Sequence, residues 1–292
     1  MNLPKLNKSG FILLNKSPSQ TSHRSLASIK RRTSLKVGHT GTLDPMVTGA
    51  MVVVLGDATK FSRWIIQQKK CYTATIQLGS RTDTDDRTGL IIESAPIEVF
   101  TIDQIIQALK NFEGTITQTP PKYSAIHING KRAYDLARKQ QSFEMPSREV
   151  TIEQTQLINY QPSLGTLTVD ITCESGTYIR SIARDLGLAL KCPAHLAELH
   201  RHWVAPFISE TYLDADEITD EHVISLEKAF ATFKNTSINK QQVIDLYHGK
   251  VIKLAITEET AAYYQDKFIG MLSPIDENYC KSIKLTQQHN LI

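Results

Sequence analysis

The chain has 292 residues, enough for one large domain or for one large and one small domain, and its 41% hydrophobic and 22% charged residues are typical of a soluble globular protein. No apolar run approaches the length of a bilayer span, and the amino terminus lacks the apolar core of a secretion signal, so we expect neither a membrane protein nor a secreted one. The four cysteines lie far apart without a C-x-x-C, a spacing typical of reduced thiols in the cytoplasm.

The net charge of +3 is unevenly distributed along the chain. Residues 1–70 carry twelve Lys and Arg against two acids, whereas the remainder carries 21 against 28. A basic region of this kind suits a polyanionic partner, although a solvated surface without any partner gives the same count.

The first predicted elements are a strand and a helix. Residues 10–16 are mostly apolar and predict a buried strand. Thr21 and Ser22 are candidate caps for a helix that continues through Arg32. The cations at positions 30–32 complement the dipole at its carboxyl end, where they are also free to contact phosphates.

Residues 37–49, VGHTGTLDPMVTG, contain three glycines, a proline and three threonines but only one carboxylate, Asp44. So many backbone breakers predict a shaped loop, and Pro45 biases Asp44 towards an extended backbone. The apolar residues 50–55 predict a buried strand directly after it. A single acid on a stiff loop beside a buried strand is typical of a catalytic carboxylate, but a tight turn with an Asx hydrogen bond has the same spacing.

Residues 57–65 have helical spacing, and residues 70–79 alternate like a half-buried strand. Tyr72 lies on the inward side of this strand, where its hydroxyl needs a partner or a cavity. The polar turn at 81–89 has three close acids, but the position of its glycine and the missing terminal glutamate argue against a calcium loop. Thr101 is the expected cap of a further helix.

Residues 119–139 interleave basic and aromatic side chains, as do surfaces that stack bases and hold phosphates. An amphipathic helix over 132–138 accounts for part of the same pattern. Residues 165–173 then predict a strand, followed by a glycine turn and a helix whose first residues include Tyr178 and Arg180. An arginine pointing from such a junction into a core needs an anion.

The last third of the chain offers weaker signals. One cysteine and three histidines lie within residues 192–202, but their spacing fits no zinc pattern. Residues 209–221 are acidic and predict a connector, followed by a helix over 224–233. Short strands are expected over 268–272 and 283–285.

The segment GHTGTLDPMVTG, residues 38–49, resembles the catalytic-aspartate motif of the TruB family, the bacterial tRNA pseudouridine-55 synthases. It departs from that motif only at Val47, where alanine is usual. Further segments resemble the family's motifs in the same order, with histidine in place of the usual residue at positions 127, 200 and 202; they are residues 10–23, 70–72, 120–138, 173–187 and 194–202.

This resemblance implies an α+β pseudouridine synthase fold, with a mixed, largely antiparallel sheet flanked by helices. It implies a catalytic domain over 1–243 with an RNA-binding insertion at about 119–150. Residues 244–292 would form a small β-rich, PUA-like domain, which is short for a full barrel and is therefore expected to be truncated.

The resemblance also implies the activity: the isomerisation of uridine to pseudouridine at position 55 in the T loop of tRNA. That reaction requires no redox change and no phosphoryl transfer, so we expect no cofactor and no metal, and the chain has neither G-x-x-x-x-G-K-[ST] nor G-x-G-x-x-G. The expected partner is the T arm of tRNA. A cytoplasmic monomer that needs no protein partner and no membrane is expected.

The residue roles follow from the same motifs. Asp44 would be the catalytic carboxylate, kept ionised by Arg180, and would add to C1′ or C6 or remove the proton at C2′. Tyr72, which could also handle the C5 proton, would line the uracil pocket with Tyr178 and Leu199. His39 would fill the space in the base stack that the extruded uridine leaves. Phosphates of the tRNA would be contacted by Lys16, Lys60, Lys131 and Arg132.

Two other interpretations remain open at this point. One is a non-catalytic protein of the same fold that binds and folds tRNA. The other is a scaffold for RNA-guided modification, as in archaeal and eukaryotic relatives of the family.

Overall fold

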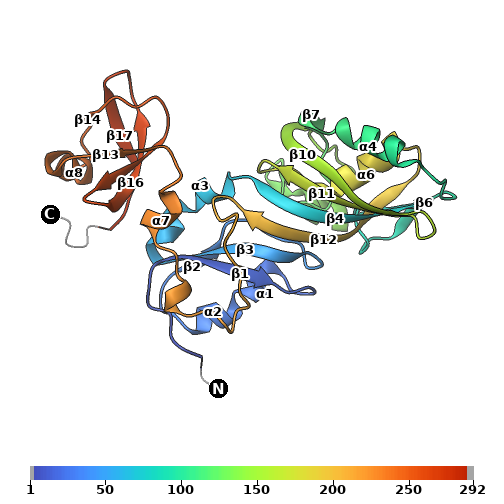
Figure 1. The fold of residues 1–292 in the computed structure, drawn as a ribbon, viewed down its shortest axis with the longest axis horizontal. Coiled ribbons are helices and arrows are strands. Elements are labelled where there is room, and N and C mark those ends of the chain that lie inside the picture. Colours follow the sequence, from blue (N-terminus) through green and yellow to red (C-terminus); the bar gives the residue numbers. More distant parts are fainter. Residues whose placement is uncertain (1–2, 288–292) are drawn as a thin grey trace.

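The computed structural model describes residues 3–287, in which the main element is an eight-stranded mixed sheet (Figure 1). Its order is β1-β3-β12-β4-β11-β10-β7, with β2 paired to β3, and all pairs except β12–β3 are antiparallel. This confirms the expected fold class. The strands are β1 (Gly10–Lys16), β2 (Val37–His39), β3 (Thr48–Leu55), β4 (Lys70–Leu78), β7 (Gly114–Gln118), β10 (Arg148–Gln161), β11 (Thr166–Cys173) and β12 (Ala194–Val204).

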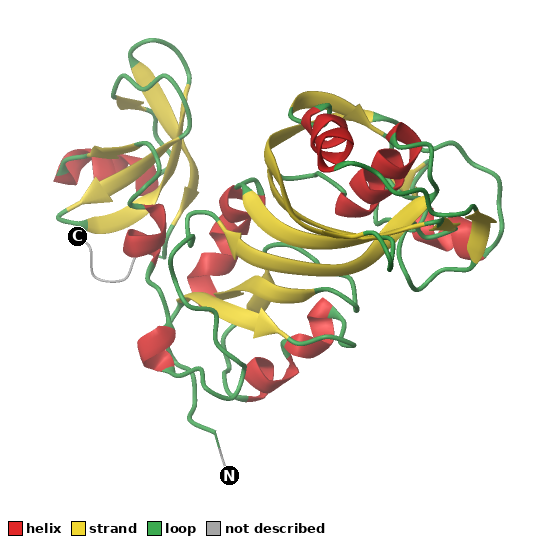
Figure 2. Cartoon of the chain, turned by 45° about the vertical axis from the view of Figure 1, so that its right-hand side comes forward, coloured by secondary structure: helices red, strands yellow, loops and turns green. Residues whose placement is uncertain are grey.

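Helices α4 (Ile102–Lys110) and α6 (Ile179–Ala189) cover one face of this sheet at the end where β10 and β11 lie (Figure 2). The alternation predicted for β4 is confirmed, because Tyr72 and every second residue after it are buried against the same core as α6. Thr101 caps α4 in a capping box with Gln104, as its sequence predicts.

The expected amino-terminal helix is wrong in its extent, since it is broken at Leu26 into α1 (Ser22–Ser25) and α2 (Ala27–Arg31). Thr21 does cap α1. Arg32 is not available for a phosphate contact, because its buried guanidinium donates hydrogen bonds to the backbone carbonyls of Pro4, Ala215 and Ile218.

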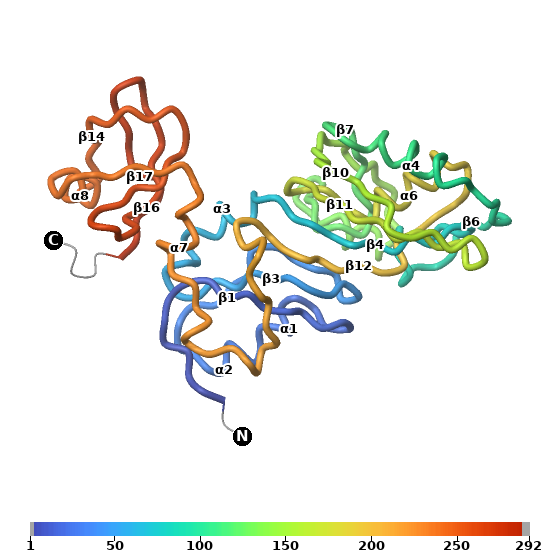
Figure 3. Tube along the Cα trace, in the orientation of Figure 1, coloured from blue at the N-terminus to red at the C-terminus, as the bar shows by residue number. Residues whose placement is uncertain are grey.

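Part of the predicted loop 37–49 is regular: residues 37–39 form β2, which pairs with β3. The acidic connector runs beside β1 (Figure 3). Leu213 exchanges backbone hydrogen bonds with Leu13 and Asn15, and Ile224, just after the connector, does so with Phe11. The connector therefore covers the open edge of β1, which would otherwise expose unpaired backbone groups.

A second, five-stranded sheet of order β13-β15-β16-β17-β14 ends the described chain and stands apart from the first (Figure 1). It takes in β13, which precedes residue 244, and the division of the chain at 243 stays a prediction. The helix expected over 224–233 is only the short α7 (Leu226–Phe230). The other elements of this part are β13 (Asn235–Ser237), α8 (Lys240–Tyr247), β14 (Ile252–Lys253), β15 (Thr260–Tyr264), β16 (Lys267–Pro274) and β17 (Tyr279–Leu285).

An aromatic cluster fixes this second sheet to the first part of the molecule. The rings of Phe230 and Phe268 stack with centroids 4.7 Å apart, and Phe61 meets both edge-on. Glu259 accepts hydrogen bonds from the indole of Trp64 and from Arg63. Buried aromatic contacts of this size make the carboxyl-terminal sheet part of one packed structure rather than a tethered module.

The remaining elements connect these layers. They are a 3₁₀ helix (Gly56–Phe61), α3 (Ser62–Ile66), β5 (Ser80–Thr82), β6 (Ile91–Ser94), β8 (His127–Ile128), β9 (Lys131–Arg132), α5 (Ala133–Arg138) and a 3₁₀ turn (Asp220–His222). Across residues 3–287, no helix has the length and apolar character needed to cross a bilayer.

Lys70 is an unusual buried cation at the start of β4. Its ammonium donates hydrogen bonds to the carbonyls of Ile66 and Gln68, 2.9 and 2.6 Å away, at the end of α3. Burial, together with the nearby Arg201, lowers the pKa of Lys70 from its ordinary value of 10.5 to about 8.

This shift predicts a pH dependence of stability. Between pH 8 and 10.5 the unfolded chain binds more protons than the folded chain, so the contribution of Lys70 to the free energy of unfolding rises with pH, by at most roughly 1.4 kcal/mol per pH unit. In Lys70→Met this contribution is absent. Urea unfolding of both proteins across that window should therefore show a difference in free energy that grows with pH, and a constant difference would contradict the buried-ammonium assignment.

Candidate active site

Asp44 lies in an open cleft of about 690 Å³ between the loop after β2 and the amino-terminal end of α6. Side chains from six separate segments meet there, although they are far apart in the sequence. Among the lining residues are Asp44, Tyr72, Asp86, Arg132, Tyr178, Arg180 and Leu199.

The loop that carries Asp44 is held on both sides of the carboxylate. Ser22 hydrogen-bonds both the N–H and the C=O of Leu43, each at 2.8 Å. Lys16 donates to the carbonyls of Pro45 and Val47, at 3.1 and 2.6 Å. The backbone at Asp44 is thus fixed from both neighbours, which a side chain needs if it is to act at a defined position.

Lys16 is therefore a brace of the loop rather than a surface group. Only 1% of the residue is exposed, and its ammonium also donates to the carbonyl of Ser17. Burial lowers the pKa of Lys16, while the charge of Asp44 opposes that shift. The expected phosphate contact from Lys16 is not supported, because its donors are directed at backbone carbonyls inside the protein.

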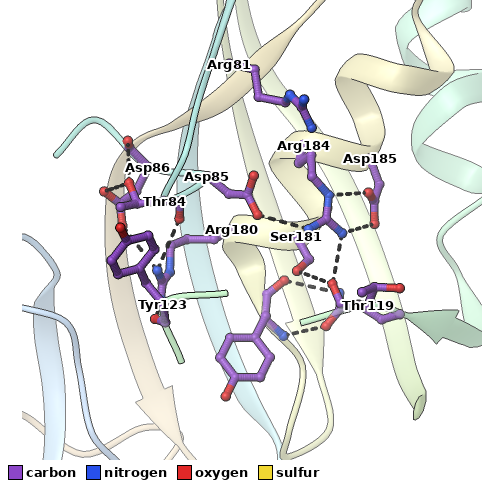
Figure 4. A network of polar contacts seen from close by, with 12 residues as sticks. Arg81, Thr84, Asp85, Asp86, Thr119, Tyr123, Arg180, Ser181, Arg184 and Asp185 are labelled. Atoms are coloured by element: carbon purple, nitrogen blue, oxygen red, sulfur yellow. Dashed lines mark hydrogen bonds and ion pairs between the residues drawn. The ribbon is translucent and has the colours of Figure 1, made fainter. Parts of the chain in front are cut away.

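Arg180, at the start of α6, joins three further segments in the cleft, and Figure 4 shows it beside Thr84, Asp86 and Tyr123. Its guanidinium lies 3.1 Å from the carboxylate of Asp44 and 3.4 Å from that of Asp86. It also donates to the carbonyls of Thr84 and Tyr123. The side chain of Arg180 is 9% exposed and that of Asp44 is 43% exposed, so the arginine is enclosed while the carboxylate still faces the cleft. The expected ion pair between them is present.

The turn after β5 supplies two acids whose role was not predicted. Asp86 is 4% exposed and accepts hydrogen bonds from Thr84 and from the N–H and hydroxyl of Thr88. Asp85 pairs with Arg184 at 2.9 Å (Figure 4). Burial raises the pKa of Asp85, and Arg184 opposes that shift.

A signal for these pairs is present in the sequence. Arg180 and Arg184 are four residues apart, hence on one face of a helix, and two such arginines need two anions. The adjacent acids Asp85 and Asp86 of the turn supply these two anions. Among the described residues, no group of three or more metal-ligating side chains is placed to hold a metal ion.

Tyr72 and Leu199 come from neighbouring strands, since Leu199 pairs with Ala74 of β4. Burial raises the pKa of Tyr72, so its hydroxyl stays protonated at neutral pH. Tyr178, directly before α6, presents its ring to the cleft and has the guanidinium of Arg148 5.0 Å from its ring centroid. These three side chains give the cleft an apolar and aromatic wall beside the carboxylate.

Of the other candidates, His39, Lys60 and Lys131 lie outside the cleft lining. His39 is half-buried on β2, and burial together with Arg201 lowers its pKa, so its imidazole is neutral at neutral pH. Lys60 pairs with Asp57 at 2.8 Å. Lys131 is exposed on the insertion, and its neighbour Arg132 reaches the mouth of the cleft.

Two histidines of β12, His200 and His202, bind hydroxyl groups. His200 is hydrogen-bonded to Thr48 at 2.9 Å, and His202 to Thr73 at 2.6 Å. Burial lowers the pKa of His200, with a further contribution from His202, whose ring centroid is 4.8 Å from its own.

Comparison with known sequences assigns most of the chain to two family profiles. Residues 25–179 match the profile described as TruB family pseudouridylate synthase (N terminal domain), and residues 180–243 match that of the tRNA pseudouridylate synthase B C-terminal domain. The tRNA pseudouridine synthase B of Microcystis aeruginosa is 40% identical over 252 residues, 85% of this chain and 86% of that protein. That of Francisella philomiragia is 34% identical over 294 residues, 97% of each chain.

Comparison with solved structures supports the fold. A chain in the crystal structure of a Cbf5-Nop10-Gar1 complex superimposes with a TM-score of 0.72 at 24% identity, covering 95% of this chain and 84% of that one. The archaeal box H/ACA sRNP Nop10-Cbf5 complex gives a TM-score of 0.71 at 22% identity, with coverages of 95% and 86%.

The network around Arg180 yields a stability prediction. Arg180→Met leaves the carboxylate of Asp86 buried without its cation, which is expected to lower the free energy of unfolding by roughly 3–5 kcal/mol. Adding Asp86→Asn removes the uncompensated charge and should recover part of the loss. Urea unfolding measures both, with the exposed Lys131→Met as a control that should match the wild type. A double variant no more stable than Arg180→Met would contradict this pairing.

Proposed function

The chain belongs to the TruB family of pseudouridylate synthases, and we propose that it converts the uridine at position 55 of the tRNA T loop to pseudouridine, with Asp44 as the catalytic group. The observation that carries this proposal is the ion pair of Asp44 with the enclosed Arg180 at the floor of the cleft. The relatives of similar length are named tRNA pseudouridine synthase B, which supports tRNA as the substrate.

The reaction breaks the N1–C1′ bond of uridine, rotates the base and joins C5 to C1′. Asp44 is suited to begin it, because its carboxylate pairs with the guanidinium of Arg180 while nearly half of that side chain stays accessible to substrate. Addition to C1′ or C6, or removal of the C2′ proton, each requires the same charged oxygen at the sugar or base.

Tyr72, Tyr178 and Leu199 would form the walls around the uracil. Tyr72 lines the cleft, where its ring is suited to stack against the base, and its hydroxyl is our candidate for handling the C5 proton late in the reaction. A stacked uridine has to leave its loop before it can reach Asp44. The neutral imidazole of His39, five residues before Asp44, is our candidate for filling the vacated space.

We propose that the T arm of tRNA lies along the insertion, whose exposed cations Lys131 and Arg132 would contact its phosphates. We further propose that the protein acts in the cytoplasm, as a monomer and without a protein partner. Purified protein acting alone on an unmodified tRNA transcript would exclude the RNA-guided alternative.

The central test is Asp44→Asn, which keeps the shape of the side chain and removes its charge. Release of tritium from tRNA carrying 5-tritiated uridine should fall by on the order of 10³-fold or more, while the Kd for tRNA stays within about twofold of the wild-type value. Asp266→Asn, at an exposed acid of the carboxyl-terminal sheet, is the control and should be fully active. An active Asp44→Asn protein, or a wild-type protein that binds tRNA without releasing tritium, would favour a non-catalytic tRNA-binding role.

A second test concerns the phosphate contacts. The double variant Lys131→Gln, Arg132→Gln should weaken tRNA binding, and the plot of log Ka against log salt concentration should become shallower by about 1–2. Lys110→Gln, Lys191→Gln removes the same charge from exposed positions outside the cleft and should leave the slope unchanged. Equal slopes in both double variants would contradict a phosphate contact on the insertion.

A further inference from the structure

The insertion enters and leaves the sheet at a single pair of residues. Gln118 is the last residue of β7 and Arg148 the first of β10, and the two are direct partners across these strands. Beyond them, the hydroxyls of Thr119 and Ser147 are hydrogen-bonded at 2.8 Å. We call these four residues the neck of the insertion.

The amide of Gln118 clamps the backbone of Tyr178. Its nitrogen donates to the carbonyl of Tyr178 at 3.1 Å, and its oxygen accepts the N–H of Tyr178 at 2.8 Å. Gln118 is 1% exposed, so both bonds are shielded from water. Tyr178 is the residue before α6, and Gln118 accepts a hydrogen bond from its N–H, one of the helix-end donors that have no partner within the helix.

The rest of the neck holds the same region. Arg148 donates to the carbonyl of Gly176 and lies against the ring of Tyr178. The carbonyl of Thr119 accepts hydrogen bonds from Ser181 and Arg184, both at 2.9 Å (Figure 4). Every residue that starts or ends the insertion is thus bonded to the first turns of α6 or to its partner across the neck.

We propose that Gln118 is a positioning residue, which sets the place of Tyr178 and of Arg180 two residues later and so couples the RNA-binding insertion to the catalytic cleft. The inference rests on the proposed function. The catalytic carboxylate and the aromatic wall have to be placed relative to the substrate to within a fraction of an ångström, because small displacements lower the rate of the chemical step. The neck ties the start and end of the insertion to the residues just before Arg180, and the hydrogen bond from Arg180 to the carbonyl of Tyr123 is a second link between the insertion and the group that pairs with Asp44.

The test compares three variants. Gln118→Met removes both bonds at similar size, and its single-turnover rate of tritium release should fall roughly 10- to 100-fold with an unchanged Kd for tRNA. Gln118→Glu keeps the acceptor for the Tyr178 N–H, and its protonated form regains the donor. Its rate relative to wild type should therefore rise as pH is lowered, while the ratio for Gln118→Met stays flat. Thr115→Val is the control, because it removes the side-chain contact with Thr151 from the same strand pair, remote from Tyr178, and should be fully active.

Hydrogen exchange supplies a readout that does not need activity. The amide of Tyr178 should exchange faster in Gln118→Met than in the wild type and Thr115→Val. Two outcomes for Gln118→Met would overturn the inference and leave the proposed function intact. One is a rate of tritium release and an exchange rate at Tyr178 that both equal those of the wild type, and the other is a loss of rate matched by an equal loss of tRNA affinity. An inactive wild-type protein would instead overturn the proposed function, and the exchange comparison would still decide whether Gln118 holds Tyr178. If Gln118→Met does not fold, the pH profile of Gln118→Glu decides the question.

Discussion

The guanidinium of Arg180 is the interaction on which the site depends. It is enclosed by the protein and directs its donors to two carboxylates and two backbone carbonyls, which come from the Asp44 loop, the turn after β5 and the start of the insertion. A planar group with five fixed donors can hold four acceptors at once, whereas an ammonium cannot. The arginine therefore gives the cleft its charge balance and also fixes the relative positions of segments that share no regular secondary structure.

Much of the fold and of the site could be predicted from local patterns. The alternation of β4 gave the inward side of Tyr72, the capping residues Thr21 and Thr101 marked helix starts, and the single acid of the 37–49 loop is in the cleft. The need of Arg180 for an anion was also predictable, because an arginine at a strand–helix junction must find one, and the resemblance to the family's motifs indicated Asp44. Such features are set by neighbours in the sequence or by a strong electrostatic requirement.

The features that could not be predicted are those that depend on which distant segments pack together. Lys16 and Arg32 have the sequence surroundings of surface cations. They are buried because the Asp44 loop packs against Lys16 and the connector against Arg32, and each directs backbone carbonyls at the cation. The sequence around Asp85 and Asp86 predicts only a polar turn. Their pairing with arginines follows from the packing of α6 beside that turn. Helix α8 was not predicted, although Asn239 and Gln242 form its capping box.

The neck of the insertion has a consequence for how this protein family can vary. Since the chain leaves and rejoins the sheet at one hydrogen-bonded residue pair, the length of the intervening segment is independent of the strand register. The entropy of closing a loop grows only slowly with its length, by about 0.6 kcal/mol for each doubling. Residues of this segment that neither line the cleft nor contact Arg180 can therefore be added, lost or exchanged without a change in the register of β7 and β10.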